Sequence, residues 1–300
     1  MRILVTGGKG FLGAWIVRRL LARGLQVRIF DVVEDRRLLR DIVGDAALAP
    51  DWRVGDIVDG AQVRAAAAGC DGIIHLAGVL TPDCQADPVR GAEINLIGTL
   101  NVFEAARAQG GAKVVYTSSA GVFGPQDGRT PFPMTHYGAF KLACEGSARA
   151  YWADHRLASI GFRPFVVYGA GRESGSSAGP SLACRAAVRG ERYTIPYTGR
   201  TGLIYADDVA AAYEAAILHP AAGPLVFNLP GVPTTTDEVI DAIRRIVPGA
   251  AIDAAGPPLP IAPDVDPGDL AEVLPGLART SLDDGLAETV AFYRRTAPAA

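Results

Sequence analysis

The chain has 300 residues, of which 49% are hydrophobic and 20% are charged. Its 29 basic and 32 acidic residues leave a net charge of −3, so a basic surface for nucleic acid is not expected. No apolar run approaches the roughly 20 residues that a membrane helix needs, and the first residues lack the apolar segment of a signal peptide. The length suits one large domain or two coupled ones.

Short apolar segments alternate with longer amphipathic ones through the first two-thirds of the chain. Strands are predicted at Ile3–Thr6, Val27–Asp31, Trp52–Val54, Gly72–Leu76, Lys113–Thr117 and Ala158–Phe162. Helices are predicted between them, at Phe11–Ala22, Arg36–Val43, Val63–Ala68, Val89–Ala108 and Tyr137–Ala153. This alternation predicts an α/β fold of the Rossmann type, a doubly wound parallel sheet with helices on both faces.

After Val167 the pattern becomes looser, beginning with a segment rich in Gly and Ser that predicts a loop at Gly169–Pro180. Further elements are predicted at Asp207–Leu218, Leu225–Leu229, Thr236–Ile246 and Leu282–Arg294. We expect residues 1–168 to form the main domain, with segments near 203–230 returning to it. Residues 169–202 and 231–300 are expected to form a smaller, partly interleaved C-terminal substrate lobe and a closing helix.

Cysteine and histidine usage bears on location and metals. The four cysteines are widely spaced without a Cys-x-x-Cys pair, which suits a reducing cytoplasm. The four histidines are isolated from one another, so no metal site is predicted.

Residues 6–13, Thr-Gly-Gly-Lys-Gly-Phe-Leu-Gly, connect the first strand to the first helix. They match the Gly-x-Gly-x-x-Gly turn of dinucleotide-binding folds and also its longer spacing, Gly7-x-x-Gly10-x-x-Gly13. The glycines permit a tight turn, and the following helix presents free N–H groups to a pyrophosphate. The alternative is an ordinary glycine-rich turn.

Acidic residues at the ends of the second and third strands bear on the choice of dinucleotide. Asp31 lies 18 residues after Gly13, where a carboxylate accepts hydrogen bonds from a ribose and repels a 2′-phosphate. This favours NAD over NADP, although Arg36 and Arg37 lie close enough in sequence to leave NADP open. Asp56 is expected to meet the adenine.

Tyr137 and Lys141 form a Tyr-x-x-x-Lys pair on one face of a predicted helix. Only three of the 29 basic residues are lysine, so such a pair is improbable by chance. A phenol is a poor base at neutral pH, but an adjacent ammonium and an oxidised nicotinamide stabilise the phenolate. Ser118 and Ser119 end the fifth strand, where either one could polarise a substrate oxygen or simply cap the strand.

Together these motifs resemble the extended short-chain dehydrogenase/reductase family, also called the NAD-dependent epimerase/dehydratase family. Further matches lie at 75–78, 95–101, 118–124, 163–169 and 281–289, so the resemblance spans nearly the whole chain. It implies that Ser119 and Tyr137 are catalytic, that Lys141 activates Tyr137, and that Asn95 assists.

The resemblance also implies which residues contact NAD and a small polar substrate. Those assigned to NAD are Gly7, Gly10, Phe11, Leu12, Gly13, Asp31, Asp56, Ile57, Leu76, Ala77, Gly78, Asn95, Thr117, Tyr137, Lys141 and Phe165. Those assigned to the substrate are Val79, Ser119, Ala120, Val166, Arg172 and Arg200. A homodimer through the helices at 89–108 and 137–153 is implied as well.

Departures from the family pattern bear on the reaction. Ala120 and Gly121 stand where sugar dehydratases carry Asp-Glu, which disfavours dehydration. Val166 replaces an asparagine usual in sugar-nucleotide epimerases, and Thr201 and Asp266 stand where those enzymes carry phosphate-binding arginines. A diphosphate needs paired cations, so the loss of two arginines weakens the case for a nucleotide-sugar substrate.

We therefore favour an NAD-dependent oxidoreductase that acts on a sugar, sugar acid or similar polar alcohol. The alternative is a nucleotide-sugar 4-epimerase of the UDP-glucose or UDP-glucuronate type. A non-catalytic dinucleotide sensor is a third hypothesis.

Overall fold

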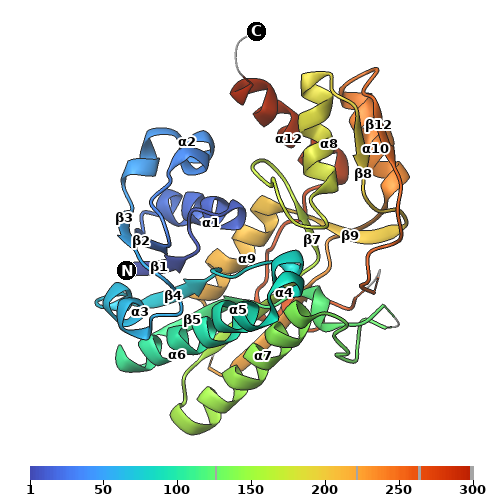
Figure 1. The fold of residues 1–300 in the computed structure, drawn as a ribbon. Helices are drawn as coiled ribbons and strands as arrows, with labels where there is room; N and C mark the ends of the chain where they lie inside the picture. The colour runs from blue at the N-terminus through green and yellow to red at the C-terminus, as the bar shows by residue number, and fades with distance from the viewer. Residues whose placement is uncertain (126, 221, 263–264, 298–300) are drawn as a thin grey trace.

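The computed structural model describes residues 1–125, 127–220, 222–262 and 265–297, and a seven-stranded sheet runs through its centre (Figure 1). The strand order is β10-β6-β5-β4-β1-β2-β3, and every neighbouring pair in it is parallel. The strands are β1 (Arg2–Thr6), β2 (Gln26–Asp31), β3 (Asp51–Val54), β4 (Gly72–His75), β5 (Lys113–Thr117), β6 (Ser159–Pro164) and β10 (Pro224–Leu229). The order reverses between β1 and β4, which is where such sheets bind ligands.

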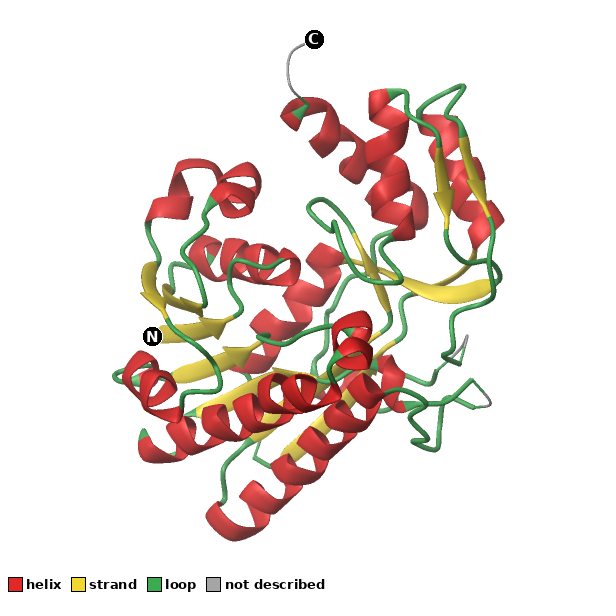
Figure 2. Ribbon diagram, viewed as in Figure 1, coloured by secondary structure: helices red, strands yellow, loops and turns green. Residues whose placement is uncertain are grey.

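Helices cover both faces of the sheet (Figure 2). One face carries α1 (Phe11–Ala22), α2 (Arg37–Val43) and α9 (Ala206–Leu218), and the other carries α3 (Gly60–Ala67), α6 (Gly98–Ala108) and α7 (His136–His155). Within β1, Ile3 and Val5 pack into the first layer and Leu4 into the second. Burial on both sides explains why the strands read as continuous apolar runs, and the predicted fold class is confirmed.

The helix predicted at Val89–Ala108 is present and contains a wide turn. The chain forms α4 (Thr81–Ala86), then α5 (Pro88–Ala92), a π-helical turn (Glu93–Ile97), and only then α6. The π turn contains Asn95, whose side-chain amide donates to the carbonyl oxygens of Val79 and Gly91 at 3.1 Å each. Such single wide turns are frequent at functional sites.

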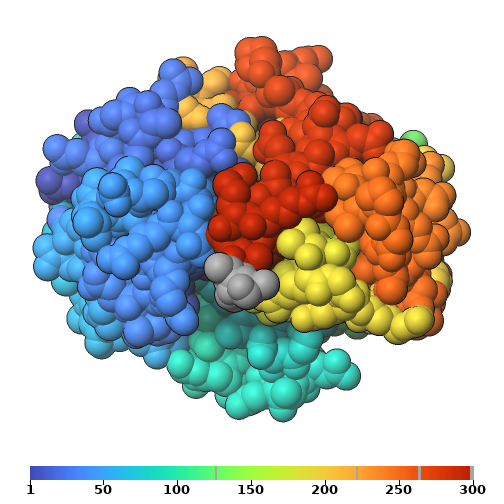
Figure 3. All heavy atoms as spheres, turned by 90° about the horizontal axis from the view of Figure 1, so that it is seen from above, coloured from blue at the N-terminus to red at the C-terminus, as the bar shows by residue number. Residues whose placement is uncertain are grey.

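The later part of the chain builds smaller sheets that the sequence pattern does not predict. β7 (Val166–Tyr168), β9 (Arg200–Tyr205) and β11 (Val232–Thr235) form one sheet, and β8 (Tyr193–Ile195) pairs with β12 (Ile252–Ala254). The helices here are α8 (Gly179–Arg189), α10 (Thr236–Ile246), α11 (Leu270–Val273) and α12 (Leu282–Thr296). Figure 3 shows α12 lying beside α8 and α10. These strands are too short, and the start of α8 too rich in Gly and Ser, for periodicity to reveal them.

Because β10 pairs with β6, residues 224–229 lie in the main sheet, whereas β9 lies in the three-stranded sheet. The division into a domain of residues 1–168, with segments near 203–230, and a smaller lobe stays a prediction. Among the helices in the described ranges, none is long and apolar enough to cross a membrane.

His75 ends β4 as a buried histidine with a partner on each ring nitrogen. The Thr6 hydroxyl lies 2.7 Å from Nδ1, and Nε2 lies 3.0 Å from Oγ1 of Thr99. Because Thr99 donates its own proton to the Asn95 carbonyl oxygen at 2.6 Å, Oγ1 is left to accept from an Nε2–H. Thr6 Oγ1 accepts from the Leu76 and Ala77 N–H groups at 3.3 Å each, so its own proton is free to go to Nδ1, and both bonds together suit a neutral ring. Burial, helped by the nearby Lys141 charge, lowers the pKa of His75 to about 3.

We expect the free energy of unfolding to fall by ~2 kcal/mol between pH 7 and pH 5 on account of His75. Its pKa is depressed in the folded chain, so the unfolded chain binds the proton first as pH drops through 6.5, the ordinary pKa of histidine. The loss continues until pH approaches about 3, where the folded form is protonated too. Urea unfolding of the wild type and of His75→Gln at both pH values measures this change in the free energy of unfolding. An equal pH response in the two proteins would contradict the assignment.

Candidate active site

The glycine turn is packed so tightly that side chains would not fit. A Cβ at Gly13 would lie 2.6 Å from the carbonyl oxygen of Gly7, and a Cβ at Gly7 would lie 2.7 Å from the backbone nitrogen of Ala77. Gly7 also has a φ of 72°, a conformation that favours glycine. Since α1 begins directly after Gly10, its first N–H groups point out of the turn without intrahelical partners. This cradle fits the pyrophosphate of a dinucleotide.

Asp31 lies beside that turn at the end of β2. Its carboxylate accepts hydrogen bonds from the backbone N–H of Lys9 at 3.0 Å and of Val32 at 2.9 Å. Burial raises the pKa of Asp31, and the two N–H donors oppose that shift. The position, at the edge of the cradle, fits a ribose hydroxyl pair.

Two other residues predicted to contact NAD have structural partners. Asp56 forms an ion pair with Arg90 at 3.0 Å and accepts from the Val58 N–H at the same distance. Ile57 is buried in the core beneath α6, where a Cβ on Gly98 would meet it. Neither lines the cavity described next.

A cavity of about 480 Å³ opens from the glycine turn across the carboxyl ends of the central strands. Its walls include these predicted residues: Gly7, Gly10, Phe11, Leu12, Gly13, Leu76, Gly78, Val79, Asn95, Thr117, Ser119, Ala120, Tyr137, Lys141, Phe165, Val166 and Arg172. Asp31, Ala77 and Arg200 are absent from the walls, although Asp31 is hydrogen-bonded to the glycine turn and Ala77 packs on Gly7. Arg200 lies at the start of β9, opposite Thr235 of β11. The fold thus gathers most of the predicted site around one space.

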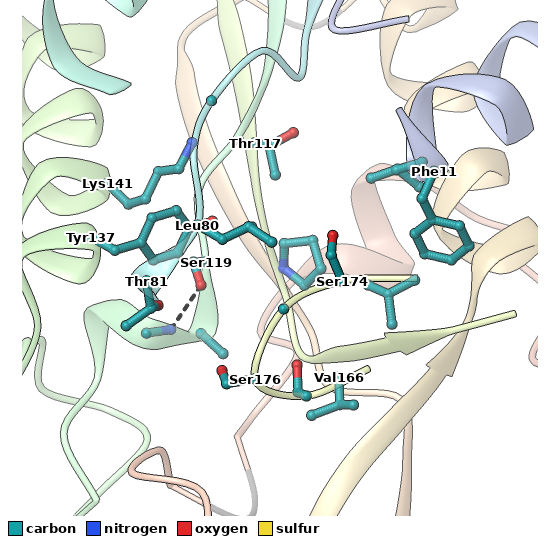
Figure 4. A pocket seen from close by; sticks show the side chains of 18 of the residues that line it. Phe11, Leu80, Thr81, Thr117, Ser119, Tyr137, Lys141, Val166, Ser174 and Ser176 are labelled. Atoms are coloured by element: carbon teal, nitrogen blue, oxygen red, sulfur yellow. Dashed lines mark hydrogen bonds between the residues drawn. The ribbon is translucent and has the colours of Figure 1, made fainter. Parts of the chain in front are cut away.

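Tyr137 and Lys141 lie one turn apart near the start of α7, which begins at a Thr135 cap. The Thr135 hydroxyl oxygen accepts from the Gly138 N–H at 3.0 Å. Lys141 is 4% exposed, and its Nζ lies 5.5 Å from the centre of the Tyr137 ring. Figure 4 shows both side chains on one wall of the cavity, close to Ser119.

The structure separates the two adjacent serines. Ser118 is buried and donates to the Glu145 carboxylate at 2.5 Å, and the same carboxylate pairs with Arg163. Ser119 Oγ accepts from the Gly121 N–H at 3.0 Å (Figure 4). Both serines line the cavity, but the Ser118 hydroxyl proton is taken up by Glu145, so Ser119 is the better candidate to bond a substrate oxygen near Tyr137.

Asn95 carries a buried oxygen that finds no hydrogen-bond partner in the described part of the chain. A Cβ placed on Gly78 would lie 2.6 Å from this Oδ1 and 3.7 Å from Nζ of Lys141. Because buried polar atoms are almost always satisfied, a water or ligand hydroxyl between Asn95 and Lys141 fits this place.

Gly121 lies beside Ser119 and Tyr137, at one of the two positions on which the prediction against dehydration rests. A Cβ there would lie 3.3 Å from Oγ of Ser119 and 3.9 Å from the Tyr137 ring. A carboxylate side chain at this position would project beside the reacting groups, and glycine supplies none. The geometry agrees with the sequence argument that general acid chemistry for water elimination is lacking here.

Several lining residues were not predicted. They lie in the loop after β7 and on the opposite rim: Leu80, Thr81, Met134, Thr135, Glu173, Ser174, Ser176, Ser177, Leu259, Pro260 and Ile261. Figure 4 shows Ser174 and Ser176 across the cavity from Tyr137. A Gly- and Ser-rich segment directly after a strand end was a usable signal for this loop, since ligands bind at that edge. Residues 259–261 carried no signal of that kind.

A doubly wound parallel sheet with this cradle at its switch point is characteristic of dinucleotide-dependent enzymes. The particular family follows from comparison with known proteins. The model of the NAD dependent epimerase/dehydratase family matches residues 3–229. The chain therefore belongs to the NAD-dependent epimerase/dehydratase family, as its motifs indicated.

Relatives within this family include both epimerases and dehydrogenases. The UDP-glucose 4-epimerase of Mycolicibacterium smegmatis is 32% identical over 320 residues, covering 98% of this chain and 99% of that protein. The D-erythronate dehydrogenase of Cupriavidus necator is 32% identical over 276 residues, 84% of each chain. The structure of Thermus thermophilus UDP-glucose 4-epimerase in complex with NAD has a TM-score of 0.85 at 28% identity, covering 99% of this chain and 100% of the other. This chain is accordingly an NAD-dependent enzyme.

Proposed function

We propose that the chain is an NAD-dependent dehydrogenase that interconverts a secondary alcohol and a ketone on a sugar acid or related polar substrate. The observation that carries the proposal is the placement of Ser119 and Tyr137 on a cavity continuous with the glycine turn. When bound, NAD supplies the carbon that accepts a hydride. The alcohol carbon loses that hydride, its hydroxyl loses a proton, and a ketone remains.

Each residue of the reacting wall has a proposed role. Tyr137 takes the hydroxyl proton as the hydride leaves, and Ser119 holds the substrate oxygen with a hydrogen bond. Lys141, buried beside Tyr137, stabilises the phenolate and binds the ribose next to the nicotinamide. Asn95, through its unsatisfied oxygen, holds a water against Lys141. Asp31 binds the adenosine ribose and disfavours NADP.

A 4-epimerase is the second candidate, favoured by the full-length similarity to UDP-glucose 4-epimerase. Against it stand Thr201 and Asp266 at the positions where phosphate-binding arginines are usual. Arg200, one residue before Thr201, does not line the cavity. Among the lining residues only Arg172 and Lys141 are basic, and Lys141 is assigned to the cofactor. A diphosphate would lack its paired cations.

We further propose a homodimer that packs α6 and α7 of one protomer against those of its partner. Val89 in α5 and Ile97 in the π turn are 72% and 43% exposed, so the segment that leads into α6 presents large apolar side chains at the surface. A cytoplasmic location is proposed because Cys70, Cys84, Cys144 and Cys184 are all free thiols, as in a reducing compartment.

Stoichiometry of NADH tests the proposed reaction. Incubating the purified enzyme with NAD and a panel of hydroxy acids, sugars and UDP-glucose is expected to give one NADH per ketone formed from a hydroxy acid or sugar. Absorbance of the reduced nicotinamide and product analysis measure both. Conversion of UDP-glucose to its 4-epimer without net NADH would instead support the epimerase.

A further inference from the structure

We propose that Arg172 binds the carboxylate of the substrate, so that the enzyme acts on compact hydroxy acids rather than on neutral alcohols or nucleotide sugars. The proposal rests on the dehydrogenase function proposed above and names its substrate class. It depends on the position of one guanidinium, on the groups that surround it, and on the charge of the cavity.

The Arg172 guanidinium lies in the cavity wall, held by the loop that follows β7. Its Nη1 donates to the Val167 carbonyl oxygen, and its Nη2 donates to Oγ of Ser177 at 2.8 Å. A Cβ on Gly175 would lie 3.6 Å from Nη2 and 3.0 Å from Leu80, so the guanidinium sits where the loop meets the opposite rim. A guanidinium has more N–H donors than these two bonds use, and the remainder can serve a ligand.

Arg172 has no acidic partner within salt-bridge distance in the described ranges, and both groups that it contacts are uncharged. The neighbouring carboxylate, Glu173, pairs with Arg185 at 2.7 Å instead. Burial lowers the pKa of Arg172 to about 10, which reflects the cost of holding a cation away from water. Arg172 is part-buried, and its guanidinium lines the cavity without a protein counterion, so an anionic ligand suits this position.

The rest of the cavity limits that anion to one small group. Opposite Tyr137 the loop presents the hydroxyls of Ser174 and Ser176, and the Thr81 hydroxyl lies on the near rim (Figure 4). These neutral groups suit additional substrate hydroxyls, and the rim at Leu259–Ile261 is apolar. Glu173 also lines the cavity, and Arg185 neutralises its carboxylate at 2.7 Å. A single guanidinium binds a carboxylate through two parallel hydrogen bonds, but a diphosphate needs more than one cation.

Pairs of probes that differ in the carboxylate measure how much this group contributes to binding. D-erythronate is compared with erythritol, and 3-hydroxybutyrate with its methyl ester, with UDP-glucose as a third arm. Thermal unfolding of NAD-saturated protein at equal probe concentrations reports binding, and NADH formation reports turnover. We expect at least one acid to raise the melting temperature more than its neutral partner does, because binding stabilises the native state.

Substitutions then assign the effect to Arg172. Arg172→Gln is expected to raise KM for the preferred acid about 10- to 100-fold, with kcat changed less than about threefold and the neutral partner unaffected. Arg172→Lys keeps the positive charge but loses the planar pair of N–H donors, so its KM for the acid should lie between those of the wild type and Arg172→Gln. Arg189→Gln, an exposed arginine of α8 outside the cavity, is the matched control and should behave as wild type. Unchanged NAD affinity in each variant shows that the fold is intact.

The proposal is overturned if neutral and acidic partners stabilise the protein equally, if no probe stabilises it, or if UDP-glucose stabilises it most. It is also overturned if Arg172→Gln weakens both members of a pair alike. The two proposals fail separately. Binding of an acid through Arg172 without NADH formation refutes the dehydrogenase alone, and equal NADH formation from acid and neutral alcohol refutes the carboxylate site alone.

Discussion

Replacing Tyr137 with phenylalanine is expected to lower kcat/KM for NADH formation by about 10²- to 10⁴-fold, the usual contribution of a positioned acid or base. The substitution removes one hydroxyl and leaves the ring beside Lys141. NAD affinity should therefore change little. Steady-state kinetics on the substrate identified above, together with NAD titration by fluorescence, measure both quantities.

Tyr151 provides a control on the same helix. Its hydroxyl donates to Glu104 at 2.9 Å, and its ring stacks on Phe103 away from the cavity. Tyr151→Phe should keep kcat/KM within about twofold of wild type, because a partly buried hydrogen bond affects stability rather than proton transfer. If Tyr137→Phe retained more than a tenth of wild-type turnover, Tyr137 would not be the acid/base.

Replacing Glu145 with alanine is expected to lower the free energy of unfolding by about 3–5 kcal/mol. Glu145 is fully buried in α7 and accepts from Arg163 on β6 at 2.7 Å and 2.5 Å and from Ser118 at 2.5 Å. The Arg163 guanidinium also lies 4.9 Å from the Phe123 ring. Removing the carboxylate leaves the largely buried Arg163 cation without its counterion, and its desolvation is then no longer compensated.

Urea unfolding of Glu145→Ala, Arg163→Ala and the double variant measures this pair. The double variant should lose less than the sum of the single losses, because the residues share one interaction. Arg245→Ala removes an exposed pair with Asp283 and should cost less than about 1 kcal/mol. Additive losses, or a Glu145→Ala loss no larger than that of Arg245→Ala, would show that the buried pair contributes little.

The sequence predicted the parallel sheet and most of the residues that line the cavity, because both depend on local pattern. Helix Phe11–Ala22 and strand Lys113–Thr117 have the bounds that periodicity indicated. The glycine turn was recognisable because its function requires small residues at set spacings. Tyr137 and Lys141 were recognisable because helical geometry alone brings residues four apart to one face.

The choice between similar residues depended on contacts distant in sequence. Ser118 and Ser119 are adjacent, chemically alike and both in the cavity wall, but the Ser118 hydroxyl donates to Glu145 in α7, whereas the Ser119 Oγ accepts from the Gly121 N–H. Arg172 and Arg200 were equal candidates, yet the loop after β7 brings Arg172 to the cavity, and β9 carries Arg200 away from it.

By itself, then, the sequence determined the fold class, the glycine turn and the Tyr137–Lys141 pair on one helix face, because each is encoded within a few turns or one strand–helix unit. Tertiary structure decided which serine hydroxyl is bound by Glu145, which arginine lines the cavity and where the π turn places Asn95. Those outcomes depend on how β7, α7 and the loops near 175 and 260 pack together. These segments lie far apart in the sequence, so a local periodicity cannot reveal how they pack against one another.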